Sequence, residues 1–313
     1  MTLVWFGILI ASLWMLTKGA DFVLDGAQRV GGRLGLTAFA AGAIIIGALT
    51  SLPDLVAAIA AQLHGAPDIV TGVAVGANIA DIFLIAAIIA IMTRGVTIVS
   101  DDISFDIAWL ATATAALVLV AINGVISTRE SFLLLMIFGV YVFTTYAIAR
   151  ERRANGKHNA YAPVTASDIT KLTVGFVLLI VGANFAVDAA IYLAGVFNIA
   201  AGVIGLFAIA LGTTLPEFFV TLQAVRAGKA SMAIGNVFGS NVFNALVVVG
   251  LPGILGKIEI DEITYVFGLT WMVASTALFI WAVLTRRRIS RAEGILYLGG
   301  YLLFALIVAG TVG

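Results

Sequence analysis

Long apolar runs fill almost the whole chain, and they constrain its fold more than any other feature. A helix needs about 20 mostly apolar residues to cross a bilayer. Only 11% of the 313 residues are charged, against about 25% in ordinary soluble domains. The sequence therefore predicts an all-α, polytopic membrane protein with ten transmembrane helices. They are expected near residues 3–28, 36–63, 67–92, 103–122, 129–149, 168–194, 199–225, 231–255, 263–284 and 291–311.

Several classes of function are excluded by what the sequence lacks. There is no cysteine, so thiolate and disulfide chemistry is absent. His64 and His158 both fall in predicted loops, so a histidine-based zinc site is not expected. No Gly-x-Gly-Asp or His-Glu-x-x-His element of a membrane protease is present. We expect no enzyme, no cofactor and no nucleic-acid partner. No protein partner is implied, which agrees with a monomer in the lipid bilayer.

One polar stretch divides the chain. It predicts a first five-helix repeat at 1–149, a cytoplasmic linker at 150–167 and a second five-helix repeat at 168–313. If both termini are extracytoplasmic, 14 of the 17 Lys and Arg residues fall in inside loops and two outside. This bias follows the positive-inside rule. We therefore expect a multi-pass protein of the cytoplasmic membrane with both termini extracytoplasmic.

From the first predicted helix to the third, the two halves align without a gap at one constant offset, which carries Asp54 onto Glu217. This repeat offset pairs Thr50–Asp54 with Thr213–Glu217 and Gly76–Ile79 with Gly239–Val242. Matches at proline, asparagine and acidic positions rarely arise by chance between apolar helices. Because five spans are an odd number, the second half enters the membrane upside down. The sequence thus predicts the inverted repeats that many secondary transporters share, although channels can have them too.

Three acidic residues lie well inside predicted spans: Asp54, Asp81 and Glu217. A charged residue at the centre of a membrane helix costs roughly 2.5–3.5 kcal/mol. None of the three has a Lys or Arg at pairing distance in its own helix. A proton or a metal cation is then the expected partner. Asp21, Asp25 and Asp188 are interpreted as structural, facing water or pairing with helix ends or with Lys18.

A proline precedes two of these acids. Pro53 and Pro216 each remove a backbone N–H and clash with the carbonyl four residues earlier. Each helix is therefore expected to kink or unwind just before the acid. The freed carbonyls and nearby hydroxyl groups would form the all-oxygen ligand set that hard cations prefer. These hydroxyls belong to Thr50, Ser51, Thr213 and Thr214. A plain helix cap or kink is the alternative.

The third and eighth predicted helices add small and polar residues. Gly72, Gly76, Gly235 and Gly239 predict close helix approach, and packing alone would also explain them. Ser240 and Asn244 are one helical turn apart, so both can face one cavity. Oxygen ligands are expected from Ser240, Asp81, Asn244, Asn78 and Asn241.

These segments resemble the alpha-1 and alpha-2 repeats of the sodium/calcium exchanger family. The family pattern is Gly-Thr-Ser/Thr-Leu-Pro-Glu followed by Gly-Asn-x-x-Gly-Ser-Asn-x-Phe-Asn/Asp. The second repeat, at Gly212–Glu217 and Gly235–Asn244, matches it almost completely. The resemblance implies that the second, third, seventh and eighth helices form the ion-binding core, past which the first and sixth slide in alternating access. It implies exchange of about three Na⁺ for one Ca²⁺.

The resemblance also assigns roles to individual residues. Asp54 and Glu217 would be the central Ca²⁺ ligands, and Thr50 and Thr213 would be shared with flanking Na⁺ sites. The resemblance further implies that Ser51, Thr214 and Ser240 bind Na⁺ through their hydroxyls. Gly47 and Ala210 would offer backbone carbonyls, and Asp81 and Asn244 would occupy the middle of the cluster.

The first repeat departs from this pattern. Asp54 replaces Glu, Val73 stands in place of Asn, and Ala77 lacks the Ser hydroxyl. Losing that hydroxyl is expected to weaken one Na⁺ site. The three acids would be neutralised by three Na⁺, or by one Ca²⁺ and one proton. We therefore predict a Na⁺/Ca²⁺ antiporter, with an H⁺/Ca²⁺ or other cation antiporter as the alternative and a passive cation channel as a less favoured one.

Overall fold

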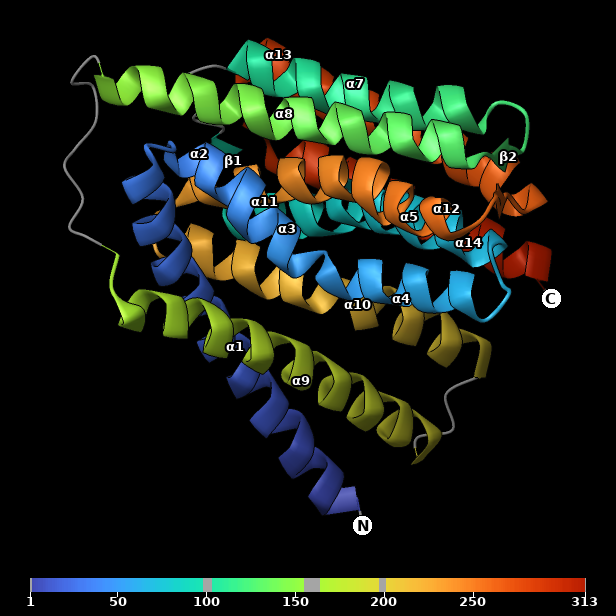
Figure 1. The fold of residues 1–313 in the computed structure, drawn as a ribbon. Helices are drawn as coiled ribbons and strands as arrows, with labels where there is room; N and C mark the ends of the chain where they lie inside the picture. Colours follow the sequence, from blue (N-terminus) through green and yellow to red (C-terminus); the bar gives the residue numbers. More distant parts are fainter. Residues whose placement is uncertain (1, 98–102, 155–163, 197–200, 313) are drawn as a thin grey trace.

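The computed structural model describes residues 2–97, 103–154, 164–196 and 201–312, and within 201–213 it describes the backbone only. These residues are nearly all helical (Figure 1). The first half contains α1 (Thr2–Leu34), α2 (Ala38–Ala41), the π-helical η1 (Gly42–Ile46), α3 (Gly47–Thr50), α4 (Leu52–Leu63), α5 (Asp68–Ala80), η2 (Asp81–Ala86), α6 (Ala87–Met92), α7 (Ile103–Ala121) and α8 (Thr128–Ala154). The second half contains α9 (Ala166–Val196), α10 (Ala201–Arg226), α11 (Ala230–Phe243), η3 (Asn244–Val248), α12 (Gly250–Leu255), η4 (Thr264–Gly268), α13 (Leu269–Arg286) and α14 (Arg291–Val312).

Among the described residues, eight helical segments are long and apolar enough to cross a membrane. A ninth is added if the bent pair Ala38–Thr50 and Leu52–Leu63 counts as one span. The protein is therefore a multi-pass membrane protein, and the count of ten spans stays a prediction. One boundary differs clearly. Arg29 and Arg33 were expected in a loop, but α1 continues to Leu34 and carries both. His158 lies outside the described residues.

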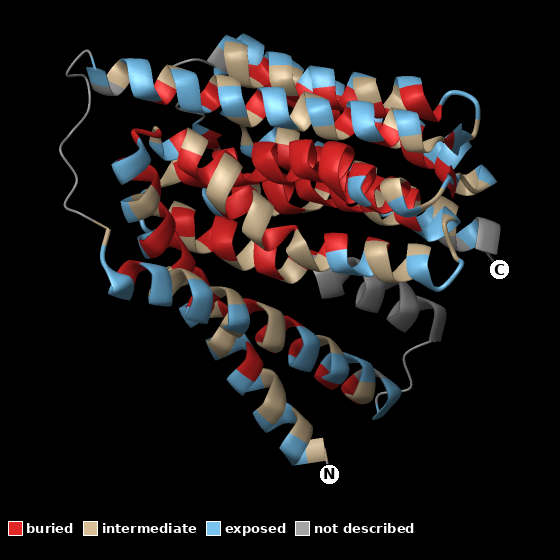
Figure 2. Cartoon of the chain, viewed as in Figure 1, coloured by how far each residue is buried: buried red, intermediate tan, exposed pale blue. Residues whose placement is uncertain are grey.

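The helices form a buried central layer with less buried helices on either side of it. In Figure 1, α1 and α9 lie along one edge and α7, α8 and α13 along the opposite edge. Burial follows this arrangement (Figure 2). In an 18-residue stretch of Ala230–Leu255, 89% of the residues are buried, whereas in such a stretch of Thr128–Arg152 only 22% are buried. A helix that is apolar all round but mostly exposed is suited to lipid, so α8 belongs to the periphery and α11 to the core.

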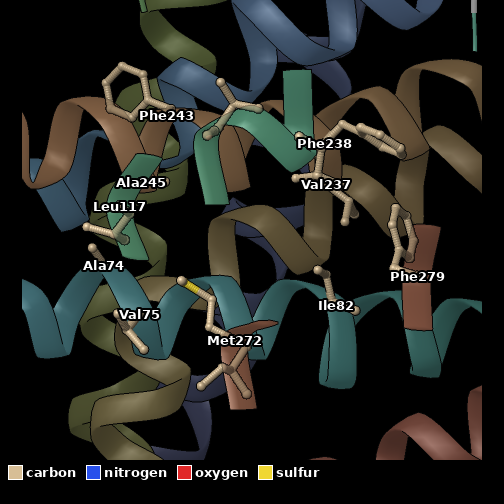
Figure 3. Close-up of a cluster of buried hydrophobic side chains, with 14 of the residues drawn as sticks. Ala74, Val75, Ile82, Leu117, Val237, Phe238, Phe243, Ala245, Met272 and Phe279 are labelled. Atoms are coloured by element: carbon tan, nitrogen blue, oxygen red, sulfur yellow. The ribbon is translucent and has the colours of Figure 1, made fainter. Parts of the chain in front are cut away.

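Aromatic and aliphatic side chains from both halves make the larger of two buried hydrophobic clusters (Figure 3). The ring of Phe238 on α11 packs against Phe39 at a centroid distance of 5.2 Å and against Phe279 at 5.1 Å. Edge-to-face and tilted pairs of this kind are the favoured aromatic geometries. Ala74, Val75 and other residues of α5 join the same cluster. The core therefore fixes α11 against α2, α5 and α13.

Glycines bring α11 and the η1–α3 segment into backbone contact. A Cβ atom at Gly239 would meet the carbonyl of Ala43, and one at Gly235 would meet that of Phe39. One at Gly47 would lie 2.7 Å from the backbone nitrogen of Ser240. The predicted close approach is thus confirmed for α11. It is not found on α5, where a Cβ atom at Gly76 would meet no heavy atom of the described residues within 4 Å.

The helices α1 and α9 form a second tightly packed unit. A Cβ atom at Gly19 would lie 2.8 Å from the carbonyl oxygen of Gly175, and the reverse distance is also 2.8 Å. The carboxylate of Asp25 on α1 lies 3.7 Å from Lys171 Nζ on α9 and 3.5 Å from Lys229 Nζ, just before α11. The second of these ion pairs, between Asp25 and Lys229, joins the α1–α9 unit to the core.

Four two-residue strands were not predicted. β1 (Val96–Thr97) pairs antiparallel with β4 (Arg288–Ile289), and β2 (Val125–Ile126) pairs with β3 (Ile258–Glu259). Each pair joins a loop of the first half to a loop of the second. Strands this short carry no periodic signal, which is why the sequence did not reveal them.

Candidate cation site

The first half-site forms where the second span breaks. The helix α3 ends at Thr50 and α4 begins at Leu52. At this break the span bends by 41°. Pro53 stands in the first turn of α4, where its missing N–H is tolerated. Asp54 follows in the same turn and is buried. The predicted break before Asp54 is confirmed.

The second half-site lies on a continuous helix. The helix α10 runs from Ala201 to Arg226 with Pro216 inside it. Of the two alternatives expected there, unwinding is wrong, since the helix continues through the proline. Thr214 and Glu217 are both buried. The side chains of Thr213 and Ala210 lie outside the described residues, so their predicted roles stay predictions.

Thr50 is the centre of a polar network that joins the two halves. Its hydroxyl lies 3.2 Å from Asn236 Oδ1 and 3.5 Å from the Ser240 hydroxyl, both on α11. Asn236 Nδ2 in turn donates to the hydroxyl of Thr221 at 3.0 Å. All four side chains are buried. Asn236 and Thr221 were not among the site residues predicted from the sequence. The Gly-Asn pair Gly235-Asn236 could have indicated Asn236.

A second network holds Asp81 at the start of η2. Its Oδ2 accepts a hydrogen bond of 3.3 Å from Asn241 Nδ2. Asn78 Nδ2 donates to the backbone carbonyl of Asn241 at 3.2 Å. The structure therefore brings Asp81 together with the predicted polar residues of α11.

Several buried polar atoms between these networks have no hydrogen-bond partner among the described residues. They include both carboxylate oxygens of Glu217, the Ser51 hydroxyl, the side-chain oxygens of Asn78 and Asn241, and both polar atoms of the Asn244 amide. Leaving one such group unsatisfied costs about 1–3 kcal/mol, and more when it is charged. These atoms need a partner that the described side chains do not supply, and a bound cation would satisfy the oxygens among them.

The three acidic side chains interact electrostatically, but their carboxylates alone do not form a metal-binding cluster. Glu217 interacts electrostatically with both Asp54 and Asp81. Nevertheless, no group of three acidic or histidine side chains among the described residues is arranged to hold a metal ion. A cation bound here would therefore need amide, hydroxyl and carbonyl oxygens beside the carboxylates. Hard cations such as Ca²⁺ and Na⁺ accept such mixed oxygen ligands.

Membrane helices that surround buried carboxylate, hydroxyl and amide oxygens are the arrangement expected of a membrane cation transporter. The family model described as "Sodium/calcium exchanger protein" matches residues 4–147 and 169–310. The chain belongs to this sodium/calcium exchanger family, and as a member it is a cation/Ca²⁺ antiporter.

Individual relatives agree over nearly the whole length. The chain is 29% identical to the inner membrane protein YrbG of Escherichia coli (strain K12), over 95% of this chain and 94% of YrbG. It is 28% identical to the sodium/calcium exchanger MaX1 of Methanosarcina acetivorans, over 97% and 98% of the two chains. Among solved structures, the sodium-calcium exchanger NCX_Mj, soaked with zero Na⁺ and Ca²⁺, is similar with a TM-score of 0.81 and 25% identity. That match covers 97% of this chain and 98% of NCX_Mj.

Proposed function

We propose that the protein is a Na⁺/Ca²⁺ antiporter of the cytoplasmic membrane that works by alternating access. The observation that carries this proposal is the set of orphaned oxygens around Glu217, Ser51 and Asn244. A bound cation would satisfy them, and the acids would balance its charge. Asp54 and Glu217 are proposed as the central Ca²⁺ ligands. Na⁺ is proposed to bind beside them through hydroxyl oxygens, chiefly those of Thr50, Ser51 and Ser240.

Paired structural features support the inverted repeat. The repeat offset that carries Asp54 onto Glu217 also carries Val96 of β1 onto Glu259 of β3, and Val125 of β2 onto Arg288 of β4. The two small sheets, β1–β4 and β2–β3, are therefore exchanged when the halves are exchanged. The two half-sites would then be oriented toward opposite sides of the membrane. Alternating access between two inverted repeats requires this arrangement.

Helix caps repeat in the same way. Glu130 accepts a bond of 2.7 Å from the backbone N–H of Ser127, and Glu293 accepts one of 2.7 Å from that of Ser290. Both are capping boxes, and the repeat offset carries the first pair onto the second. They support ten spans arranged as five and five, with α8 and α14 as equivalent helices.

The packing supports a division into two bodies. Glycine contacts join α11 to η1 and α3, and other glycine contacts join α1 to α9. We propose that α1 and α9 slide as a unit past the core and open the site to either side in turn. The excess of Lys and Arg in loops on one side of the predicted topology supports placing both termini outside the cell.

Flux into sealed vesicles tests this function. Proteoliposomes loaded with Na⁺ and diluted into Na⁺-free buffer with radioactive Ca²⁺ should accumulate Ca²⁺, and collapsing the Na⁺ gradient with an ionophore should stop accumulation. Uptake that ignores Na⁺ but follows an imposed pH gradient would refute Na⁺ coupling. It would support the H⁺/Ca²⁺ alternative, which the missing hydroxyl at Ala77 favours. Ca²⁺ entry without any counter-ion would indicate a channel.

A further inference from the structure

Repeat-related positions around the site differ sharply in polarity. Asn236, Ser240 and Thr221 are buried, and together with Thr50 they form one polar network. The repeat offset pairs them with Val73, Ala77 and Ala58, in that order. Two symmetric half-sites would give two equivalent networks, but each of these three side chains from the second half has an apolar counterpart.

The apolar counterparts are part of the packed interior. Ala58 and Ala77 are buried, and Val73 packs against the hydrophobic core. None of them has a side-chain oxygen. A cation placed beside them would lose its hydration without gaining ligands from these side chains, and taking a charge out of water without such compensation is very unfavourable.

The polar side, in contrast, has the chemistry of a small cation site. The hydroxyls of Thr50 and Ser240 are 3.5 Å apart, and the amide oxygen of Asn236 lies 3.2 Å from the first of them. The Ser51 hydroxyl next along the chain is buried and has no partner among the described residues. Neutral oxygens of this kind suit a monovalent cation, because a divalent ion usually recruits carboxylates.

We propose that only one of the two positions flanking the central acids binds a monovalent cation, so that the protein exchanges two Na⁺ for each Ca²⁺ and moves no net charge. This inference rests on the proposed Na⁺/Ca²⁺ exchange. One Na⁺ occupies the Thr50–Ser240 side, and a second occupies the central site in place of Ca²⁺. Two Na⁺ carry the same charge as one Ca²⁺. The acids therefore face the same total charge in both loaded states.

The Ca²⁺ gradient at equilibrium reports this stoichiometry directly. In proteoliposomes held at zero membrane potential with K⁺ and valinomycin, a tenfold Na⁺ gradient should sustain a Ca²⁺ gradient of about 100-fold, because each exchanged Na⁺ contributes one factor of ten. A gradient of about 1,000-fold, which three Na⁺ would sustain, would overturn the proposal.

The membrane potential supplies a second readout. Two-for-one exchange should give the same Ca²⁺ gradient with no potential as with a potential of about 100 mV. Three-for-one exchange moves one charge, and about 100 mV would then change the gradient by about 50-fold. A voltage-dependent gradient in the unmodified protein would contradict the proposal.

The double variant Val73→Asn/Ala77→Ser restores the missing oxygens. It should raise the Ca²⁺ gradient above that of the unmodified protein and make it voltage-dependent. An unchanged gradient in a variant that elutes as a folded protein would contradict the role given to these positions. If the double variant does not fold, Ala77→Ser alone serves the same purpose. Failure of Na⁺ to drive any Ca²⁺ accumulation, with a pH gradient driving it instead, would overturn the proposed function itself.

Discussion

Asn78 donates a side-chain hydrogen bond of 3.2 Å to the backbone carbonyl of Asn241, the residue that occupies the equivalent position in the second repeat. In the proposed inverted repeat, a residue that contacts its own counterpart would lie close to the axis that relates the two halves. Asn241 in turn donates to Asp81. The polar centre of the protein thus joins the two halves of the chain. In the inverted-repeat architecture proposed above, this is where transporters bind their substrates.

The central carboxylates should be essential for transport but not for folding. Glu217→Gln and Asp54→Asn keep the size of each side chain and remove its charge, which would deprive Ca²⁺ of its two proposed central ligands. We expect Na⁺-driven Ca²⁺ uptake to fall by at least about 100-fold, which corresponds to roughly 3 kcal/mol of lost interaction. Thermal unfolding in detergent should show that both variants remain folded.

Asp188→Asn is the matched control for that experiment, because Asp188 is an exposed acid on α9. It removes the same charge from a helix that carries neither predicted ligand. Near-normal uptake in this variant and substantial uptake in both carboxylate variants would together refute the assigned ligands.

The contact between α11 and η1 should tolerate no added methyl group. In Gly239→Ala the new Cβ atom would meet the carbonyl of Ala43, and overpacking of this kind typically costs about 1–3 kcal/mol. We expect a lower unfolding temperature in detergent. Gly139→Ala on α8 is the control, since a Cβ atom there would meet none of the described residues within 4 Å. Equal stability of the two variants would contradict the close packing.

The ion pairs of Asp25 should matter for turnover more than for stability. Asp25 links α1 to Lys171 on α9 and to Lys229 beside the core. Exposed pairs of this kind are worth about 0–1 kcal/mol. If α1 must slide past the core, Asp25→Asn should raise the Na⁺-driven exchange rate by up to about fivefold.

Asp21→Asn is the comparison for Asp25→Asn. Asp21 forms an ion pair with Lys18 on the same helix, at 3.7 Å. Pairing with Lys18 was one of the alternatives predicted from the sequence. That pair joins nothing to the core, so its loss should leave the exchange rate unchanged. The same rate change in both variants would argue against a role for Asp25 in the sliding step.

The sequence predicted the positions of the helices well because lipid demands long apolar runs. The run expected at 67–92 coincides with the span Asp68–Met92. The bend before Asp54 was also predictable, since a proline acts on its own helix. The continuous helix through Pro216 was not, because neighbouring helices can support a proline within a membrane span.

The site was predicted in part. Thr50, Ser240, Asp81 and Asn244 are all buried where the two halves meet. Thr221 could not be found from the sequence, because its role depends on a bond to Asn236 that only tertiary packing creates. The asymmetry of glycine packing is a similar case. Gly76 and Gly239 occupy equivalent positions, yet only Gly239 closely approaches another backbone among the described residues.

Diffraction from crystals soaked with Sr²⁺ tests the central claim most directly, because Sr²⁺ can stand in for Ca²⁺ and scatters anomalously. We predict an anomalous peak within about 2.3–2.8 Å of carboxylate oxygens of Asp54 and Glu217, and its loss in crystals of Glu217→Gln. A strong peak elsewhere in the membrane region, with none between these two residues, would contradict the account.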